Sequence, residues 1–354
     1  MKAWRVDPSA RTLTFDDVPI PVARRGAVTA RVEAAMVLSY MAEVLDGVRG
    51  DSLPERAFIP GTNAVGVIES VGEGVYHLQP GQRVFLQPHV LADERVRNPA
   101  QVLMGHNFRQ GAGAEQLQND WVDGTFAEVV EWPAAQVTPI DALGDLPPEQ
   151  VLSLSKLVVP YGGFLRVGLQ PGESVAVNGA SGFYGSGGVL MALAMGATRV
   201  FALGRNEAAL REVCSHDPRA IPVVLSGDSE RDTANLKEQS HGGIDVALDV
   251  VGAASAKSTR SVLRSLNRSG RLAMMGSCTE PLAIDFGEML MNDWLIAGQF
   301  MYPRTATAQL IELAAAGLLS LTAAKPRCFP LEELRDAMQH GTTMKGLDLT
   351  AVVP

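Results

Sequence analysis

One stretch, residues 174–205, constrains the fold of this chain more than any other. It reads SVAVNGASGFYGSGGVLMALAMGATRVFALGR, in which an apolar strand, a glycine-rich turn, an apolar helix and a second strand follow one another. The turn has the spacing GxGxxG, with Ala180 at the first position, Gly182 at the second and Gly185 at the third. Small residues there allow a tight exit from the strand, close approach of the backbone to a pyrophosphate, and close packing of the helix on the strand. The stretch therefore predicts a βαβ unit that binds a dinucleotide, rather than an ordinary glycine-rich turn.

The start of the helix in this unit is the expected phosphate site. The first N–H groups of a helix have no partner within the helix, and they attract anions. The residues of the turn that we expect to contact the cofactor are Ala180, Ser181, Gly182, Phe183 and Tyr184.

The end of the second strand indicates which dinucleotide is bound. A site for NAD usually has Asp or Glu about 20 residues after the turn, where the carboxylate binds the ribose hydroxyls. Here Gly204 occupies that position and Arg205 follows it. A guanidinium group pairs with a 2′-phosphate, and no carboxylate is present to repel it. We therefore predict NADP(H) rather than NAD(H), although an exposed arginine at a helix start is the plainer interpretation of Arg205.

Composition limits the class of protein. The chain has 354 residues, 46% of them hydrophobic, which suits two domains with sizeable cores. Its net charge of -9 argues against nucleic acid or an anionic membrane as a partner. The start, MKAWRVDPSA, has no apolar signal segment, and the three cysteines are scattered without a CxxC motif. We expect a cytoplasmic protein without disulfides or a cysteine metal site.

The first 140 residues are predicted to be mainly β-structure, with strands at 2–6, 28–37, 65–71 and 82–86 and a short helix at 40–45. Residues 87–125 are polar and irregular, which indicates either a surface lobe or a cover over a substrate pocket. A long helix is expected from about 147 to 167, and a final strand at 347–353 could return to the first domain.

From about residue 147, helices alternate with apolar strands, which is typical of a parallel sheet. Six strands are expected, at 174–178, 199–203, 222–225, 245–249, 271–275 and 295–301. The fold class is therefore α/β, with a doubly wound sheet. Ligands of such sheets lie beyond the carboxyl ends of the strands. The further residues expected to contact the cofactor are Val250, Val251, Gly276, Ser277, Phe300 and Met301, although each could equally be a plain strand end.

Three stretches together resemble the medium-chain dehydrogenase/reductase superfamily of alcohol dehydrogenases and quinone oxidoreductases. They are IPGTNAVGVIESVGEGVYHLQPGQRV, WVDGTFAEVVEWP and VPYGGFLRVGLQPGESVAVNGASGFYG. The resemblance implies a GroES-like β-barrel catalytic domain, formed by residues 1–155 and 302–354, and a Rossmann domain at 156–301. It also implies an active site in the cleft and a homodimer joined through the Rossmann sheets.

The chain departs from this family at the zinc ligands. Zinc-dependent members hold the catalytic metal with a Cys, the His of a Gly-His-Glu motif, and a second Cys. The matching positions here are Leu38, Thr62 and Ser155, and residues 87–125 lack the four cysteines of the structural zinc lobe. Leucine cannot bind zinc, and neutral hydroxyls bind it poorly. We predict no zinc at either place, and the spacing of His77, His89 and His106 does not indicate a new site.

Without zinc, another group must stabilise charge on the substrate oxygen. Tyr40 is the main candidate for this catalytic role, because zinc enzymes of the family have a proton-relaying Ser or Thr at the matching position. Tyr40 could instead line the nicotinamide pocket or pack in the core. The weaker donor candidates are Ser39, Asn63, Ser155 and Lys156.

The predicted function is reduction of a small activated alkene or quinone by NADPH, without zinc. The segment Leu38-Ser39-Tyr40-Met41 lacks the Asn-Pro-x-Asp pattern usual in quinone oxidoreductases, which weakens a direct transfer of that activity. Two alternatives remain. One is a zinc-free, NADP(H)-dependent alcohol dehydrogenase or carbonyl reductase, and the other is an NADPH-binding protein without catalytic activity.

Overall fold

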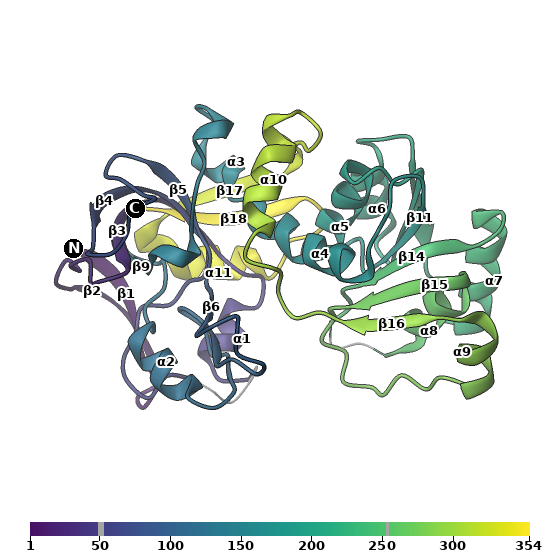
Figure 1. The fold of residues 1–354 in the computed structure, drawn as a ribbon, viewed down its shortest axis with the longest axis horizontal. Coiled ribbons are helices and arrows are strands. Elements are labelled where there is room, and N and C mark those ends of the chain that lie inside the picture. The colour runs from purple at the N-terminus through teal and green to yellow at the C-terminus, as the bar shows by residue number, and fades with distance from the viewer. Residues whose placement is uncertain (49–52, 253–254) are drawn as a thin grey trace. The chain divides into compact units, whose positions relative to one another are not determined.

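The chain folds into two compact units in the computed structural model, which describes residues 1–48, 53–252 and 255–354 (Figure 1). The first unit comprises Met1–Ser155, Ala324–Met344 and Leu349–Pro354, and the second comprises Lys156–Ala323 and Lys345–Asp348. The predicted domains differ from these units at the C-terminal end, because residues 302–323 group with the second unit. Helix α10 (Ala306–Ala315) lies there beside α4 (Leu154–Val167), and the Tyr161 hydroxyl donates a hydrogen bond to Gln309 at 3.0 Å.

The second unit is built on six parallel strands in the order β13-β12-β11-β14-β15-β16, which confirms the predicted doubly wound sheet. The strands are β11 (Ser174–Asn178), β12 (Arg199–Gly204), β13 (Ala220–Val224), β14 (Ile244–Asp249), β15 (Leu266–Met274) and β16 (Leu295–Gly298). All five residues of the central strand β11 are buried. A parallel strand covered on both faces requires such a continuous apolar run, which explains why the sequence shows no alternation there.

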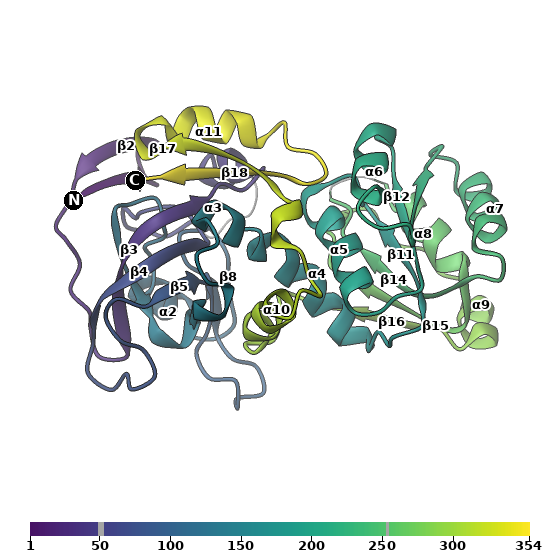
Figure 2. The same ribbon diagram turned by 90° about the horizontal axis from the view of Figure 1, so that it is seen from above.

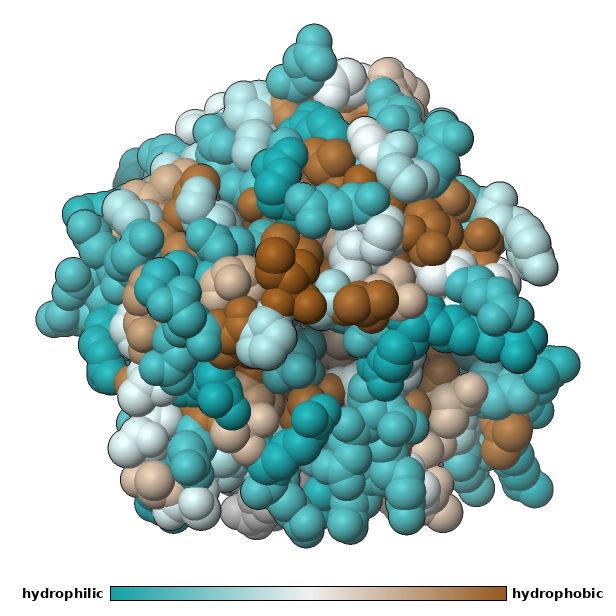
Figure 3. Space-filling model, turned by 90° about the vertical axis from the view of Figure 1, so that its left-hand side faces the viewer, coloured by the Kyte–Doolittle hydropathy of each residue, from teal (hydrophilic) through white to brown (hydrophobic). Residues whose placement is uncertain are grey.

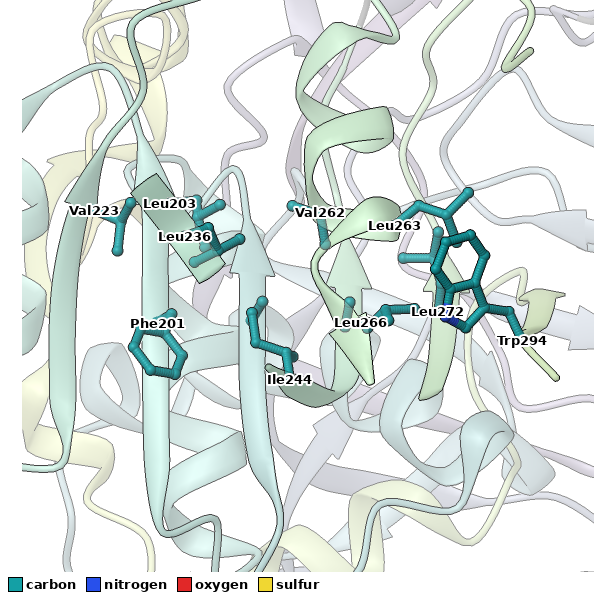
Figure 4. Packing of buried hydrophobic residues seen from close by; sticks show 12 residues of the cluster. Phe201, Leu203, Val223, Leu236, Ile244, Val262, Leu263, Leu266, Leu272 and Trp294 are labelled. Carbon is teal, nitrogen blue, oxygen red and sulfur yellow. The ribbon is translucent and has the colours of Figure 1, made fainter. Parts of the chain in front are cut away.

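Helices cover both faces of this sheet (Figure 2). Helices α5 (Phe183–Ala194) and α6 (Glu207–Cys214) lie on one face; α7 (Ser229–Ser240), α8 (Lys257–Arg264) and α9 (Phe286–Asn292) lie on the other. Figure 4 shows the core under α7 and α8, where Phe201 and Leu203 of β12 face the same side as Leu236 of α7. Alternate residues of β12 therefore point to opposite faces of the sheet.

The first unit is mainly antiparallel. Its largest sheet has the order β10-β5-β4-β3-β18-β17, with β9 also paired to β3. These strands are β3 (Ala27–Met36), β4 (Ala64–Val71), β5 (Arg83–Leu86), β9 (Val129–Pro133), β10 (Val137–Pro139), β17 (Lys325–Pro330) and β18 (Asp348–Val353). The C-terminal strand β18 pairs antiparallel with β3, which confirms the predicted return of the chain end to the first domain. A separate hairpin joins β1 (Lys2–Asp7) to β2 (Thr12–Asp17).

Residues 87–125 contain more regular structure than we expected. Strands β6 (His89–Leu91), β7 (Gln101–Leu103) and β8 (Arg109–Gln110) form a small sheet, and α2 (Ala114–Asp120) follows it. The prediction of an irregular segment was wrong because these strands are only two or three residues long. Strands this short have no periodicity that a sequence could reveal.

The helix expected at 147–167 is also divided, into α3 (Pro148–Val151) and α4. The hydroxyls of Ser153 and Ser155 donate to the carbonyl oxygens of Gln150 and Leu152, and such side-chain bonds compete with a continuous helix. The remaining helices are α1 (Met41–Leu45), α11 (Leu334–Gly341) and four 3₁₀ turns at Ala134–Gln136, Asp141–Leu143, Leu321–Ala323 and Leu331–Glu333.

Within the described residues, no helix has both the length and the apolar character needed to cross a bilayer. On the face drawn in Figure 3, hydrophilic side chains predominate and hydrophobic ones form small separate groups, as on an ordinary globular surface.

Candidate functional site

The glycine-rich turn leaves β11 in a tightly held conformation. Gly179 has a φ of +91°, in the left-handed region that favours glycine. The N–H groups of Gly179 and Ala180 both donate to the Leu203 carbonyl, at 3.0 and 2.8 Å, and so fasten the turn to β12. The Gly182 N–H donates back to the Gly179 carbonyl at 2.9 Å.

Gly185 permits α5 to lie directly on this turn. A Cβ atom at residue 185 would collide with the carbonyl group of Gly179. Gly182 is the N-cap of α5, and with no side chain it supplies no capping hydrogen bond. The first N–H groups of α5 therefore keep their capacity to bind an anion, as a dinucleotide site requires.

A pocket of about 470 Å³ opens at the carboxyl ends of the strands, beside this turn. The pocket lies where β11 separates β12 from β14, so it is at the point where the strand order reverses and ligands of doubly wound sheets bind. Six of the predicted cofactor residues line it: Ser181, Gly182, Gly204, Arg205, Val250 and Val251.

The other predicted cofactor residues are not in this lining. Ala180 is buried beneath the turn, and Phe183 and Tyr184 are half-buried in the first turn of α5. Gly276 and Ser277 are exposed beyond β15, while Phe300 and Met301 lie beyond β16. All of them are at the same edge of the parallel sheet as the pocket.

Two buried polar residues at strand ends were missed by the sequence analysis: Asn178, which lines the pocket, and Asp249, which ends the neighbouring strand β14. The Asn178 amide donates to the Asp249 carboxylate at 3.0 Å and to the Ser258 hydroxyl at 3.1 Å. Asp249 also accepts the N–H of Val251 at 3.0 Å, which shapes the loop after β14. The signal was a polar residue ending each of two adjacent apolar strands, but which strands are adjacent is known only from the sheet order.

The charge of the pocket suits a phosphorylated ligand. Arg205 and Lys257 line it and are exposed, whereas Asp232 is the one acidic residue among the described residues of the lining. The Asp232 carboxylate accepts the N–H groups of Ser226 and Gly227, at 2.8 and 3.1 Å, so it is already solvated by the protein. A Cβ atom at Gly204 would lie 2.7 Å from the Ser181 hydroxyl, so an acidic side chain at this position would require the Ser181 side chain to move.

The residues at the zinc-ligand positions do not form a metal site. Leu38, Thr62 and Ser155 are all buried. The Ser155 hydroxyl donates to the Leu152 carbonyl and lies against the Met36 sulfur, while the Thr62 hydroxyl has no hydrogen-bond partner within the described residues. Across residues 1–48, 53–252 and 255–354, no three His, Cys, Asp or Glu side chains form a group suited to a metal ion. The residues present therefore do not fit zinc.

Three glycines cross next to Thr62 in the first unit. Gly61, Gly105 and Gly124 approach so closely that a Cβ atom on Gly105 or Gly124 would collide with the backbone of Gly61. The crossing places Thr62, His106 and Thr125, each the next residue in the chain, in a buried polar neighbourhood.

The main catalytic candidate lies beside this crossing. Tyr40 is half-buried at the start of α1, and its ring meets that of His106 edge-on with the centroids 6.3 Å apart. Among the weaker candidates, Ser39 is half-buried and the Asn63 amide donates to the Leu86 carbonyl at 3.4 Å. Lys156 is buried in the second unit, where its ammonium group donates to two backbone carbonyls and a hydroxyl.

Comparison with known proteins identifies the family. Residues 24–142 match the model of the alcohol dehydrogenase GroES-like domain, and residues 185–316 match the model of the zinc-binding dehydrogenases. An alcohol dehydrogenase of Moraxella sp. (strain TAE123) is 28% identical over 351 residues, which are 96% of this chain and 95% of the relative. The chain belongs to the medium-chain dehydrogenase/reductase superfamily.

Other members of this superfamily match over the full length. A sorbitol dehydrogenase of Bacillus subtilis (strain 168) is 25% identical over 353 residues, covering 98% of this chain and 95% of the relative. In fold, the chain resembles a putative zinc-binding dehydrogenase of Sinorhizobium meliloti 1021 bound to NADP, with a TM-score of 0.78, 22% identity, and coverage of 100% and 99%.

These findings confirm the predicted superfamily, with a GroES-like domain and a Rossmann-like domain. This member of the superfamily is an oxidoreductase that uses a pyridine nucleotide and acts on small molecules.

We predict that Gly185→Ala destabilises the second unit, because the new methyl group would force α5 away from β11. The free energy of unfolding should fall by about 1–3 kcal/mol, the usual cost of overpacking. The matched control is Gly182→Ala, whose Cβ atom would lie 3.3 Å from the Gly179 carbonyl oxygen and needs only a small adjustment. Urea unfolding of both variants measures the difference, and equal stability of the two would contradict the predicted contact.

Proposed function

We propose that this protein is a zinc-independent, NADP(H)-linked oxidoreductase whose substrate is a small activated alkene or quinone. The observation that carries the proposal is the set of residues at the three catalytic metal positions, which are Leu38, Thr62 and Ser155. A catalytic zinc needs three nitrogen, sulfur or ionised oxygen ligands and an open site. None of these three side chains supplies such an atom at neutral pH, so stabilisation of the substrate oxygen falls to hydrogen bonds.

The preference for NADP(H) rests on Gly204 and Arg205 at the end of β12. Arg205 and Lys257 give the exposed part of the pocket lining a positive character, and Gly204 supplies no carboxylate. The dinucleotide would be held by the N–H groups at the start of α5 and by the strand ends that form the pocket. The NADP bound to the dehydrogenase from Sinorhizobium meliloti is consistent with this preference.

A bound nicotinamide would supply or accept the hydride. We assign to Tyr40 the stabilisation of the negative charge that develops on the substrate oxygen during this transfer. A phenol at the start of α1 can donate a hydrogen bond, or a proton, to an oxygen on which negative charge develops. His106, whose ring meets the Tyr40 ring edge-on, orients the phenol and excludes water from its buried side.

Reduction of an activated alkene is the reaction that we favour. Addition of hydride to such an alkene gives an enolate, over which the negative charge is spread. In carbonyl reduction the charge is localised on an alkoxide, which is harder to stabilise without a metal. The relatives include an alcohol dehydrogenase and a sorbitol dehydrogenase, which favours the second candidate, a zinc-free alcohol dehydrogenase or carbonyl reductase.

We also propose that two copies associate through the edge of the sheet at β16. Within the described residues, this strand pairs with β15 alone, and both β16 and α9 carry exposed apolar side chains. These side chains are Phe286 (91% exposed), Leu290 (70%), Met291 (73%) and Leu295 (50%). Apolar groups at an open strand edge promote pairing with another strand. A cytoplasmic location fits the three cysteines, none of which forms a disulfide.

The cofactor preference predicts the outcome of Arg205→Ala. Loss of a charge-assisted hydrogen bond to the 2′-phosphate should weaken NADPH binding by about 10- to 100-fold, which corresponds to roughly 1.5–3 kcal/mol. Binding of NADH, which lacks this phosphate, should change less than about twofold. Fluorescence titration of both nucleotides provides the measurement, with Arg231→Ala on α7 as a control outside the pocket. An equal effect on both nucleotides would refute the assignment.

The catalytic assignment predicts the outcome of Tyr40→Phe. Without the hydroxyl, kcat should fall by about 10²- to 10⁴-fold, while NADPH binding stays unchanged. Tyr76→Phe is the control, because Tyr76 is 94% exposed. The assay compares a conjugated enone and a quinone with a simple ketone and an aldehyde, in the presence and absence of a chelator.

The same assay separates the candidate functions. Chelator-insensitive oxidation of NADPH by the enone or quinone supports the first, and activity with the ketone or aldehyde alone supports the second. Inhibition by the chelator would refute zinc independence. Full activity of Tyr40→Phe would refute the role of Tyr40.

The proposed association predicts that Leu295→Lys shifts the protein from dimer to monomer, because charge on an edge strand opposes pairing. Light scattering coupled to gel filtration measures the mass. Leu318→Lys is the control, since Leu318 is 61% exposed and lies outside β16 and α9. A wild-type protein that is monomeric throughout the accessible concentration range would disprove the association.

A further inference from the structure

A buried ammonium group lies directly behind the glycine-rich turn between β11 and α5, residues 179–185, which we call the phosphate-binding turn. Lys156 is the third residue of α4, and its side chain is fully buried. Its Nζ atom donates hydrogen bonds to the Gly346 carbonyl at 2.6 Å, the Phe183 carbonyl at 3.1 Å and the Ser186 hydroxyl at 3.1 Å. It also lies 4.2 Å from the centre of the Phe183 ring, within the range of a cation–π interaction. The acceptors come from two segments that are far apart in the sequence.

The acceptors of Lys156 are themselves linked to one another. The Ser186 hydroxyl shares its proton between the carbonyl oxygens of Gly346, at 2.5 Å, and Phe183, at 3.0 Å. The N–H of Gly346 donates to the Ser181 carbonyl at 2.9 Å. The network therefore joins the start of α4, the turn at Lys345–Asp348 and both ends of the phosphate-binding turn.

Helix α5 packs closely against α4 beside this network. A Cβ atom at Gly187 would lie 2.5 Å from the Lys156 carbonyl oxygen, so α5 is pressed against α4 at this level. If the Lys156 ammonium were absent, two carbonyl groups and a hydroxyl would lose a donor inside the protein. Buried polar groups without partners are costly, so the turn would have to rearrange.

Among the described residues, the elements packed against Lys156 carry few charged groups. Helix α5 carries no acidic or basic residue, and the first turn of α4 has no charged residue other than Lys156 itself. The turn at Lys345–Asp348 contains two charged residues, Lys345 and Asp348. The Asp348 carboxylate accepts the backbone N–H of Lys345 at 3.0 Å. Burial lowers the pKa of Lys156 to about 7, and Asp348 opposes this effect in part. Burial therefore brings the pKa of Lys156 toward the physiological range, while the geometry makes its ammonium group hold the turn.

We propose that Lys156 is a positioning residue that holds the phosphate-binding turn and couples binding of the dinucleotide to uptake of a proton. The inference rests on the proposed nucleotide site. The protonated amine adds positive charge behind the N-terminus of α5, where the anionic pyrophosphate would sit. Bound phosphate therefore favours the ammonium form, and a solvent proton binds to the neutral amine. By linkage, the protonated protein binds the dinucleotide more tightly.

The test measures NADPH affinity and proton uptake in wild type and in Lys156→Met. Calorimetric titrations at pH 7.5 in two buffers of different ionisation enthalpy give the number of protons taken up. In wild type, we expect uptake of part of a proton and an affinity that falls about three- to tenfold between pH 6.5 and pH 9. In Lys156→Met we expect weaker binding, and the share of proton uptake and pH dependence due to Lys156 should vanish. Ionisation of the 2′-phosphate is common to both proteins and cancels in the difference.

Three further variants separate positioning from simple structural support. Lys156→Arg keeps a charge that does not titrate in this range, so it should restore affinity at high pH and remove the pH dependence. Ser186→Ala removes one partner and should weaken binding while the proton uptake persists. Leu157→Met alters the neighbouring buried residue of α4 and should change neither quantity. Thermal melting of each variant shows which of them are folded.

The outcomes are distinguishable. If wild type binds NADPH without taking up a proton, and its affinity does not depend on pH, the inference is overturned. This result counts even if Lys156→Met fails to fold. A folded Lys156→Met that keeps the wild-type affinity and pH profile overturns it as well. If wild type binds no nicotinamide dinucleotide at any pH, the proposed function fails instead.

Discussion

The contact between the end of β11 and the first turn of α5 is the constraint on which the second unit depends. Gly185 lies on the carbonyl group of Gly179 with no space for a side chain, and Gly179 itself has a positive φ. Because α5 is held so close, its first N–H groups point beyond the edge of the sheet, where the pocket lies. The six parallel strands then bring Gly204, Val250 and Val251 to the same edge.

The network around Lys156 supports this contact from the opposite side of the turn. A turn rich in glycine has many accessible conformations, and ordering it costs conformational entropy. Backbone bonds to Leu203 hold its first residues, and the buried ammonium holds the Phe183 carbonyl. The segment at Lys345–Asp348, which precedes the last strand, completes the arrangement through Gly346. The start of α5, where we propose that phosphate binds, is thus held by residues about 160 positions away from it in the chain.

In the first unit, the crossing of Gly61, Gly105 and Gly124 brings three buried polar residues together, which are Thr62, His106 and Thr125. Buried hydroxyl and imidazole groups can form hydrogen bonds, whereas a zinc site requires charged or strongly basic ligands in a fixed geometry. The superfamily models identify the fold, and the side chains at these positions decide which chemistry it can support.

The sequence by itself determined the superfamily, the βαβ unit and the strands of the doubly wound sheet, because glycine spacing and apolar runs are local signals. It also showed Gly204 and Arg205 at the end of β12 and, through the resemblance to the superfamily, Leu38, Thr62 and Ser155 at the positions that match the zinc ligands. The short strands after residue 87 and the division between α3 and α4 were not predictable, since nothing in their periodicity differs from a loop or a continuous helix. The pairing of Asn178 with Asp249, the edge-on contact of Tyr40 with His106, and the burial of Lys156 were decided by the tertiary structure alone. Each of these features depends on contacts between segments that are far apart in the sequence. Such contacts are set by strand order and helix packing, so no local sequence pattern predicts them.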